Sequence, residues 1–288
     1  MSVSQQHSGH GIGEGVLRIL FGGFLAVAAI GLALSPWPEL FAAITALMTL
    51  FAAREWHRMV RAPAKAAQME RHALHIQTII TGATTACALT ALVFQTVPAA
   101  LACLVLGTIA SYIWAQRQDD NPLWHAGGVL YIGLPCMALV ALRVFPLQPQ
   151  LIVLGLFLIV WATDTGALVF GKLIGGPKLA PSISPGKTWA GTIGGSICAG
   201  LVYGLYIWFY GFSATSAMLF AFAFSAVAHG GDLFESFVKR RFGRKDSGRI
   251  IPGHGGVLDR IDSTFAAAPV MALLVFALDL NPLFGGFR

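Results

Sequence analysis

Residues 151–171 read LIVLGLFLIVWATDTGALVFG, an apolar run in which Asp164 is the only charged side chain. A spanning helix needs about 20 mostly apolar residues, so this run is long enough to cross a bilayer. Asp164 would lie roughly 10 Å inside the membrane, where a lone carboxylate costs several kcal/mol unless it is paired, solvated or ion-bound. The run predicts a membrane helix with a functional cavity. The alternative is a carboxylate bonded to Thr163, Thr165 or a neighbouring helix.

The composition agrees with a membrane protein. Of the 288 residues, 56% are hydrophobic and 11% charged, whereas soluble domains carry roughly 25% charged residues. A soluble chain this apolar would expose patches that water does not tolerate. The four cysteines show no C-x-x-C spacing and no nearby His cluster, which disfavours a zinc site.

About nine spanning helices are expected, which makes the fold class all-α and polytopic with short cytoplasmic loops. Residues 1–15 are expected to be a disordered tail and residues 16–288 a single helical membrane domain. The shortest span, residues 39–53, is also compatible with a re-entrant hairpin. The expected spans are residues 16–34, 39–53, 76–94, 97–115, 126–144, 151–171, 190–212, 214–237 and 263–280.

The basic residues indicate the orientation of these helices. With the N-terminus inside, every Lys and Arg except Arg143 and Arg288 falls at a cytoplasmic helix end or loop. Cytoplasmic loops of membrane proteins carry an excess of Lys and Arg. The pattern predicts a multi-pass protein of the cell inner membrane whose active face is cytoplasmic.

Two polar cassettes, residues 161–191 and 229–263, interrupt the apolar pattern at cytoplasmic helix ends. In the second, Asp259 and Asp262 are three residues apart at the start of the last helix. Together with Asp164, such acidic helix ends suit a hard divalent cation such as Mg²⁺. Helical spacing also predicts one polar face, formed by Asp232, Glu235, Ser236 and Lys239.

A dense basic array surrounds these acids. For Arg241 and Arg244, attraction of anionic lipid is an equally good interpretation. It leaves the interleaved acids unexplained, and a mixture of carboxylates, Lys, Arg and Gly favours a metal–polyphosphate complex. The array comprises Lys172, Lys178, Lys187, Lys239, Arg240, Arg241, Arg244, Lys245, Arg249 and Arg260.

The segment SPGKT, residues 184–188, ends like a phosphate-binding P-loop, but Pro181 stands where the first Gly belongs and no strand is expected before it. We therefore expect phosphate to be held by Lys187 and by the backbone amides of the next helix. That helix carries two small-x-x-x-small pairs, Gly191 with Gly195 and Gly200 with Gly204. They favour close helix packing within the subunit over a dimer contact.

Residues 236–262, SFVKRRFGRKDSGRIIPGHGGVLDRID, resemble the signature of the phosphatidate cytidylyltransferase (CDP-diacylglycerol synthase) family. Residues 164–167 and 184–191 are similar to its D-T-G-A and S-P-x-K-T-x-E-G segments, with Ala190 in place of the usual Glu. The resemblance implies CTP and membrane phosphatidate as substrates, Mg²⁺ as cofactor, a helical membrane fold and a homodimer. No nucleic-acid partner is expected.

The resemblance also places the metal-binding acids at Asp232 and Asp259, and we add Asp262. Phosphatidate is already largely dianionic near pH 7, so His254 is expected to bind phosphate or shape its loop rather than to act as a general base. The expected catalytic residues are Asp232, Asp259, Lys239, Arg240, Lys245, Asp246, His254 and Arg260. The expected substrate-binding residues are Asp164, Ser184, Lys187, Thr188, Ser236, Gly255 and Gly256.

Two other functions fit parts of the pattern. An ion-coupled transporter would also have many helices and a buried Asp164, but it would place charge near the midplane in both halves of the chain. The first half is nearly free of such charge. A CTP-dependent lipid or prenol kinase would release CDP instead of pyrophosphate.

Overall fold

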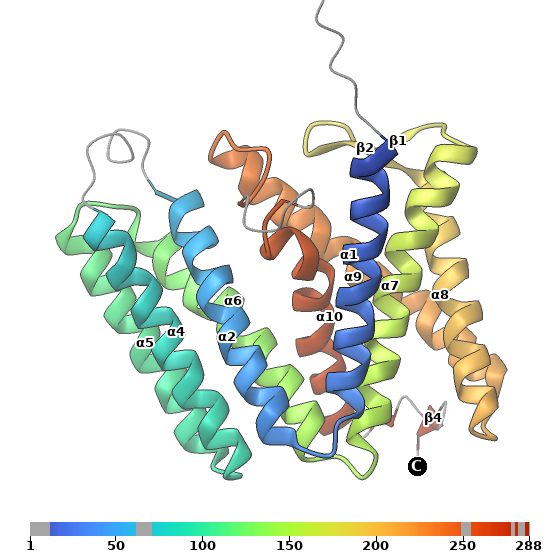
Figure 1. Ribbon diagram of the computed structural model, residues 1–288, viewed down its shortest axis with the longest axis horizontal. Coiled ribbons are helices and arrows are strands. Elements are labelled where there is room, and N and C mark those ends of the chain that lie inside the picture. The colour runs from blue at the N-terminus through green and yellow to red at the C-terminus, as the bar shows by residue number, and fades with distance from the viewer. Residues whose placement is uncertain (1–11, 62–70, 249–254, 278–279, 282–285, 288) are drawn as a thin grey trace, which may run out of the picture.

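A computed structural model describes residues 12–61, 71–248, 255–277, 280–281 and 286–287 (Figure 1). These residues form an all-α bundle with two short hairpins, which confirms the expected fold class. The helices are α1 (Ile12–Leu34), α2 (Pro38–Met59), α4 (Arg71–Val93), α5 (Val97–Arg117), α6 (Pro122–Val144), α7 (Pro149–Leu173), α8 (Trp189–Phe209), α9 (Ala214–Arg241) and α10 (Leu258–Phe276). The strands are β1 (Lys178–Ala180), β2 (Ser184–Thr188), β3 (Leu280–Asn281) and β4 (Gly286–Phe287).

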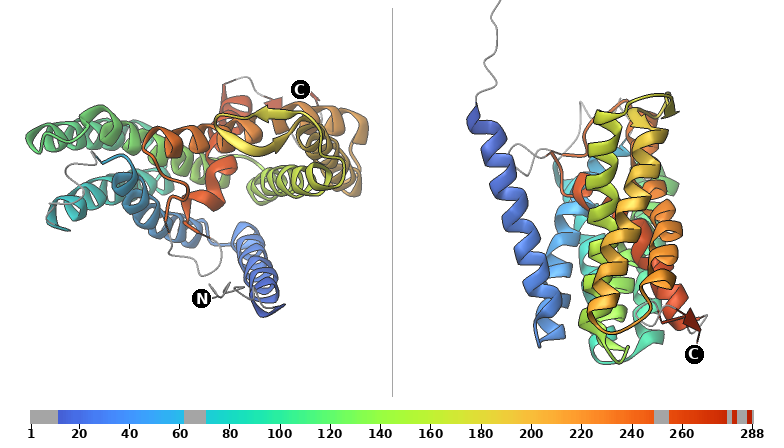
Figure 2. Two further views of the ribbon diagram at one scale, coloured as in Figure 1. Left: turned by 90° about the horizontal axis from the view of Figure 1, so that it is seen from above. Right: turned by 90° about the vertical axis from the view of Figure 1, so that its right-hand side faces the viewer.

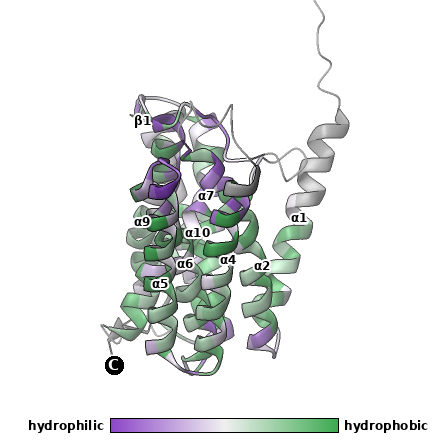
Figure 3. Cartoon of the chain, turned by 90° about the vertical axis from the view of Figure 1, so that its left-hand side faces the viewer, coloured by the Kyte–Doolittle hydropathy of each residue, from purple (hydrophilic) through white to green (hydrophobic). Residues whose placement is uncertain are grey.

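The bundle has the surface of a membrane protein. Among the described residues, six helices, α4 to α9, are long and apolar enough to cross a bilayer. Large apolar side chains point outward from them: Leu106 is 65% exposed, Leu205 65% and Phe209 78%. Hydrophobic residues cover the middle of the helices, and hydrophilic ones gather at the end that carries β1 (Figure 3). Lipid, rather than water, suits this surface.

Helix α2 is a continuous helix of 22 residues and not part of a re-entrant hairpin. At 1.5 Å per residue it is roughly 33 Å long, enough to cross a hydrocarbon core of about 30 Å. It runs antiparallel to α1, which contacts α7 and, less extensively, α2 (Figures 1 and 2). The C-terminal ends of α2, α5, α7 and α9, near which most of the basic residues lie in the sequence, are therefore at one end of the bundle (Figure 1).

Helix α8 packs closely against both of its neighbours through glycines. A Cβ added at Gly191 would lie 2.7 Å from the carbonyl oxygen of Ala167, and one at Gly195 would lie 2.5 Å from that of Thr163, both on α7. A Cβ at Gly200 would meet a backbone oxygen of α9 at 3.0 Å. Such distances exclude side chains. The small pairs therefore pack within the subunit, as the sequence favoured.

The first half of the chain contains a buried polar chain that its sequence did not predict. Arg61 Nε lies 2.9 Å from Asp120 Oδ2, and His125 Nε2 lies 3.3 Å from the same oxygen. His57 contacts both His125, at 2.8 Å, and Thr81, at 2.7 Å. Arg61 follows α2 and Asp120 precedes α6. These charged residues therefore lie at the end of the bundle where α2 ends and α6 begins, and not near the membrane midplane, where a transporter would place them.

Candidate functional site

The segment expected to bind phosphate is a β-strand. Residues 184–188 form β2, which pairs antiparallel with β1, Lys178 opposite Thr188, at the loop end of α7 and α8 (Figure 2). A strand thus precedes the segment, which corrects the expectation of none. Thr188 is the N-cap of α8, and its Oγ1 accepts a hydrogen bond of 3.1 Å from Gly191 N. Ser184, at the other end of β2, is half-buried.

The hairpin brings the two cassettes together. Lys187 Nζ lies 2.7 Å from Asp232 Oδ2 on α9 and donates to the carbonyl oxygen of His229 at 3.4 Å. Arg240 Nε, also on α9, donates to the carbonyl oxygen of Ile183 at 3.3 Å. Two predicted site residues of opposite charge, Lys187 and Asp232, are therefore neighbours although they are far apart in sequence.

The polar face predicted for α9 is confirmed. Ser236 Oγ donates to Asp232 Oδ1 at 3.4 Å. Lys239 Nζ lies 3.5 Å from Glu235 Oε1, whose side chain is fully buried, and 2.9 Å from Asp259 Oδ1 on α10. Asp262 lies within electrostatic range of Glu235. The acids of α9 and α10 therefore face each other, with Lys239 between them.

Asp164 joins this group from α7. Its Oδ1 accepts a hydrogen bond of 3.2 Å from Ser263 Oγ on α10, whereas Thr163 Oγ1 donates to the backbone of its own helix. The Asp164 side chain stays accessible although protein surrounds it, and Asp232 and Asp262 are within electrostatic range. Asp164 thus has a partner on a neighbouring helix, as the alternative interpretation of the sequence predicts, and lies near the acids of α9 and α10.

The loop before α10 is built around Asp259. Asp259 Oδ2 accepts a hydrogen bond of 2.8 Å from Gly256 N, and both carboxylate oxygens lie 3.3 Å from Ser247 N. Gly255 has a φ of +84°, and a Cβ there would meet Asp259 Oδ2 at 2.8 Å. Only glycine suits that backbone conformation and space. Arg260 is exposed on the first turn of α10, and His254 lies outside the described residues.

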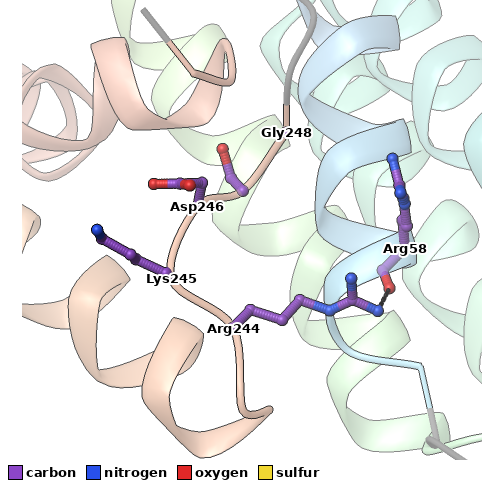
Figure 4. A pocket seen from close by; sticks show the side chains of 6 residues that line it. Arg58, Arg244, Lys245, Asp246 and Gly248 are labelled. Carbon is purple, nitrogen blue, oxygen red and sulfur yellow. Dashed lines mark hydrogen bonds between the residues drawn. The ribbon is translucent and has the colours of Figure 1, made fainter. Parts of the chain in front are cut away.

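A cavity of about 390 Å³ lies where the loop after α9 meets α2 (Figure 4). Arg244 spans it and donates from Nη2 to the carbonyl oxygen of Arg58 at 2.9 Å. Partial burial, and then the charge of Arg58, lower the pKa of Arg244. The sequence did not connect Arg58 with the site. The cavity is lined by Arg58, Arg244, Lys245, Asp246, Ser247 and Gly248.

The acids of α7, α9 and α10 suit a hard cation by their donor chemistry, since Mg²⁺ prefers carboxylate oxygen. Within the described ranges, however, no three Asp, Glu, His or Cys side chains converge as a metal site. Lysines contact one oxygen each of Asp232 and Asp259. A carboxylate offers about four lone-pair sites, so Asp232, which contacts Lys187 and Ser236, retains capacity for another partner. Asp259 also accepts from Ser247 N and Gly256 N, so it would exchange one of its contacts for a cation.

Comparison with known proteins agrees with the motifs. Residues 16–278 match the pattern of a family described as "Cytidylyltransferase family". The chain is 44% identical over 153 residues to a protein named phosphatidate cytidylyltransferase from Brucella suis biovar 1, covering 52% of this chain and 56% of that one. Proteins of the same name from Rickettsia bellii (42% over 166 residues, 55% and 71%) and Staphylococcus haemolyticus (44% over 152 residues, 52% and 57%) are also similar.

These matches differ in extent. The alignments with Brucella and Staphylococcus proteins span little more than half the length of the relatives. The family pattern, in contrast, covers nearly all of the chain, including both cassettes and all described helices from α2 to α10. The chain therefore belongs to the cytidylyltransferase family.

Proposed function

We propose that the chain is a phosphatidate cytidylyltransferase, which transfers the cytidylyl group of CTP to phosphatidate and yields CDP-diacylglycerol and pyrophosphate for phospholipid biosynthesis. The observation that carries the proposal is the meeting of acids and lysines from α9, α10 and the β1–β2 hairpin at one end of a membrane bundle. The names of the relatives support the same reaction.

The reaction needs positioning more than acid–base chemistry. The second pKa of a phosphate monoester is about 6, so phosphatidate is largely dianionic near pH 7. One of its oxygens attacks the α-phosphorus of CTP, and the bond to the β-phosphate oxygen breaks. Pyrophosphate leaves with that electron pair. The main barrier is the approach of two polyanions, which alignment and neutralisation of charge reduce.

The roles of the side chains follow from this requirement. Asp232 and Asp259, with Asp262 nearby, would hold Mg²⁺, because one or two carboxylates together with substrate phosphates suffice for this ion. When bound, the ion supplies positive charge to the CTP phosphates. Lys187 and Lys239 lie 2.7 and 2.9 Å from two of these carboxylates, so each ammonium can reach a phosphate that approaches the acids. Arg240, Lys245 and Arg260 add positive charge around the same end, while Ser184 and Thr188 form the hairpin wall.

The same charges support a location. The basic clusters gather at one end of the bundle (Figure 1), and Lys and Arg favour the cytoplasmic side of a membrane. We therefore place the site at the cytoplasmic face of the inner membrane. A homodimer remains a proposal based on the family resemblance.

Labelled CTP tests the reaction. The purified protein in detergent is incubated with phosphatidate, Mg²⁺ and CTP labelled at either the α- or the γ-phosphate, and the lipid is extracted. Label from the α-position in the lipid, with release of pyrophosphate, is expected. Label from the γ-position instead would identify a lipid kinase. Absence of labelled lipid from both would refute the proposal.

An Asp259→Asn variant tests the metal site. It should lose turnover while remaining folded, because the amide keeps an acceptor oxygen but lacks the charge that binds a divalent cation. Glu39→Gln, an exposed acid at the other end of the bundle, is the control and should remain active. Substantial Mg²⁺-dependent turnover by Asp259→Asn would contradict its role as a ligand.

A further inference from the structure

Helix α10, which carries Asp259 and Asp262, begins without a cap from its own segment. Its N-cap residue is Val257, whose side chain cannot accept a hydrogen bond. The first backbone N–H groups of a helix have no partner within the helix and need one elsewhere. Glu55, on α2, supplies it: Oε1 accepts from Val257 N at 3.0 Å and Oε2 from Leu258 N at 2.9 Å.

The same carboxylate fits into the loop before α10. Ser247 Oγ lies 3.3 Å from Glu55 Oε2, and the Glu55 side chain is 2% exposed. A Cβ at Gly248 would overlap the Glu55 carboxyl group, and one at Gly256 would lie 2.6 Å from its Oε2. The two glycines therefore leave the space that Glu55 fills.

This loop also holds Asp259. The backbone N–H groups of Ser247 and Gly256 donate to the Asp259 carboxylate. The Ser247 hydroxyl and the N–H groups of Val257 and Leu258 donate to Glu55. Two carboxylates thus bind one short backbone path, the adjacent amides of residues 256–258. A displacement of Val257 and Leu258 on loss of Glu55 would therefore also move the Gly256 amide that orients Asp259.

The end of α2 is itself fixed. Trp56 Nε1 donates to the carbonyl oxygen of Trp124 at 2.9 Å. Asn121 Nδ2 donates to that of Val60 at 2.7 Å, and the buried Arg61–Asp120 pair follows directly. Glu55 therefore stands on a helix end tied to α6 and can act as a fixed reference for the loop.

We propose that Glu55 is a positioning residue for the nucleotidyl transfer, holding the start of α10 so that Asp259 keeps its orientation. The inference rests on the proposed function. Groups that support a reacting centre matter because displacements of about 1 Å can cost roughly 100-fold in rate. Glu55 acts through the backbone of residues 256–258 and not on the substrates.

Kinetics of full-length variants in detergent test the role. Glu55→Ala removes all three contacts and should lower kcat by roughly 100-fold, and Glu55→Gln, which keeps one acceptor oxygen, by roughly 10-fold. The KM for phosphatidate should stay within about twofold in both, since the lipid does not touch Glu55. Glu39→Gln is the matched control. Unchanged kcat in Glu55→Ala would overturn the proposal.

A double variant separates positioning from general damage. Gly248→Ala should lower kcat because its methyl group displaces the Glu55 carboxylate. Once that carboxylate is removed, the methyl group has space, so Glu55→Ala/Gly248→Ala should be no slower than Glu55→Ala alone. If the fold-losses in kcat of the two single variants multiply in the double variant, Gly248 and Glu55 act independently, and this result would contradict the proposal.

Amide hydrogen exchange provides a measurement without turnover. The N–H groups of Val257 and Leu258 should exchange faster in Glu55→Ala than in the wild type, while the helix α8 keeps its protection. Glu55→Gln serves the same comparison should Glu55→Ala not fold. If the wild-type protein makes no CDP-diacylglycerol, the proposed function is wrong. Unchanged exchange of the Val257 and Leu258 amides in Glu55→Ala overturns the Glu55 inference, whatever the outcome of the activity assay.

Discussion

Replacing Lys239 by Met should reduce both stability and turnover. The Lys239 ammonium lies between Glu235 Oε1, at 3.5 Å, and Asp259 Oδ1, at 2.9 Å, and the Glu235 side chain is fully buried. Removing one partner of a buried pair costs about 3–5 kcal/mol, because the remaining charge stays unpaired in a poorly polar environment. Lys239 is 12% exposed, so we expect the lower end of that range.

Thermal unfolding in detergent measures this cost. A loss of about 3 kcal/mol should lower the midpoint by roughly 6–12 °C, by the scaling for a large globular chain. Lys172→Met, at an exposed position on α7, is the control and should change the midpoint little. Adding Glu235→Gln to Lys239→Met removes the unpaired charge and should recover part of the stability. Turnover should stay low in the double variant, because Asp259 still lacks its lysine.

Two results would refute this reasoning. A Lys239→Met protein that unfolds at the wild-type temperature would show that the buried Glu235 does not depend on the lysine. A double variant less stable than Lys239→Met would show that Glu235 contributes through another partner. In either case the pairing of α9 with α10 would not rest on Lys239.

Three further substitutions give distinct expectations. Lys187→Gln breaks the pair with Asp232, whose side chains are 18% and 34% exposed, so the free energy of unfolding should fall by less than about 1 kcal/mol. The KM for CTP in steady-state assays should rise roughly tenfold, because a charged phosphate contact is lost. Gly255→Ala should cost about 1–2 kcal/mol in thermal unfolding, because of its positive φ, and should lower kcat by displacing Asp259. Gly230→Ala, with nothing within 4 Å of the added Cβ, should do neither. Gly195→Ala should destabilise the α7–α8 contact by about 1–3 kcal/mol, and an unchanged midpoint would contradict the close approach to Thr163.

Local patterns predicted the helices and much of the site. The spacing of Asp232, Glu235 and Lys239 depends only on helical periodicity, and the structure confirms their shared face. The lengths of the apolar runs likewise predicted the order of the helices. Both properties are encoded within about 20 consecutive residues, so no knowledge of distant contacts was needed.

Other features depend on contacts that no local pattern contains. The expected span at residues 39–53 ends two residues before Glu55, so the apolar pattern leaves this acid outside the helix, whereas α2 continues to Met59. The strands β1 and β2 have three and five residues, too few for an alternating pattern, and Pro185 and Gly186 lie within β2. The Arg61–Asp120 pair joins the ends of two different helices. Each of these needs the packed bundle.

The bond between Glu55 and α10 also has a consequence for biosynthesis. Its partner amides lie 202 and 203 residues later in the chain. At translation rates of about 5–20 residues per second, α2 is made roughly 10–40 s before the residues that it holds. The proposed site is therefore complete only after α10 has been made. A chain truncated before α10 would leave the Glu55 carboxylate without these two backbone donors, and a buried acceptor that loses its donors costs free energy.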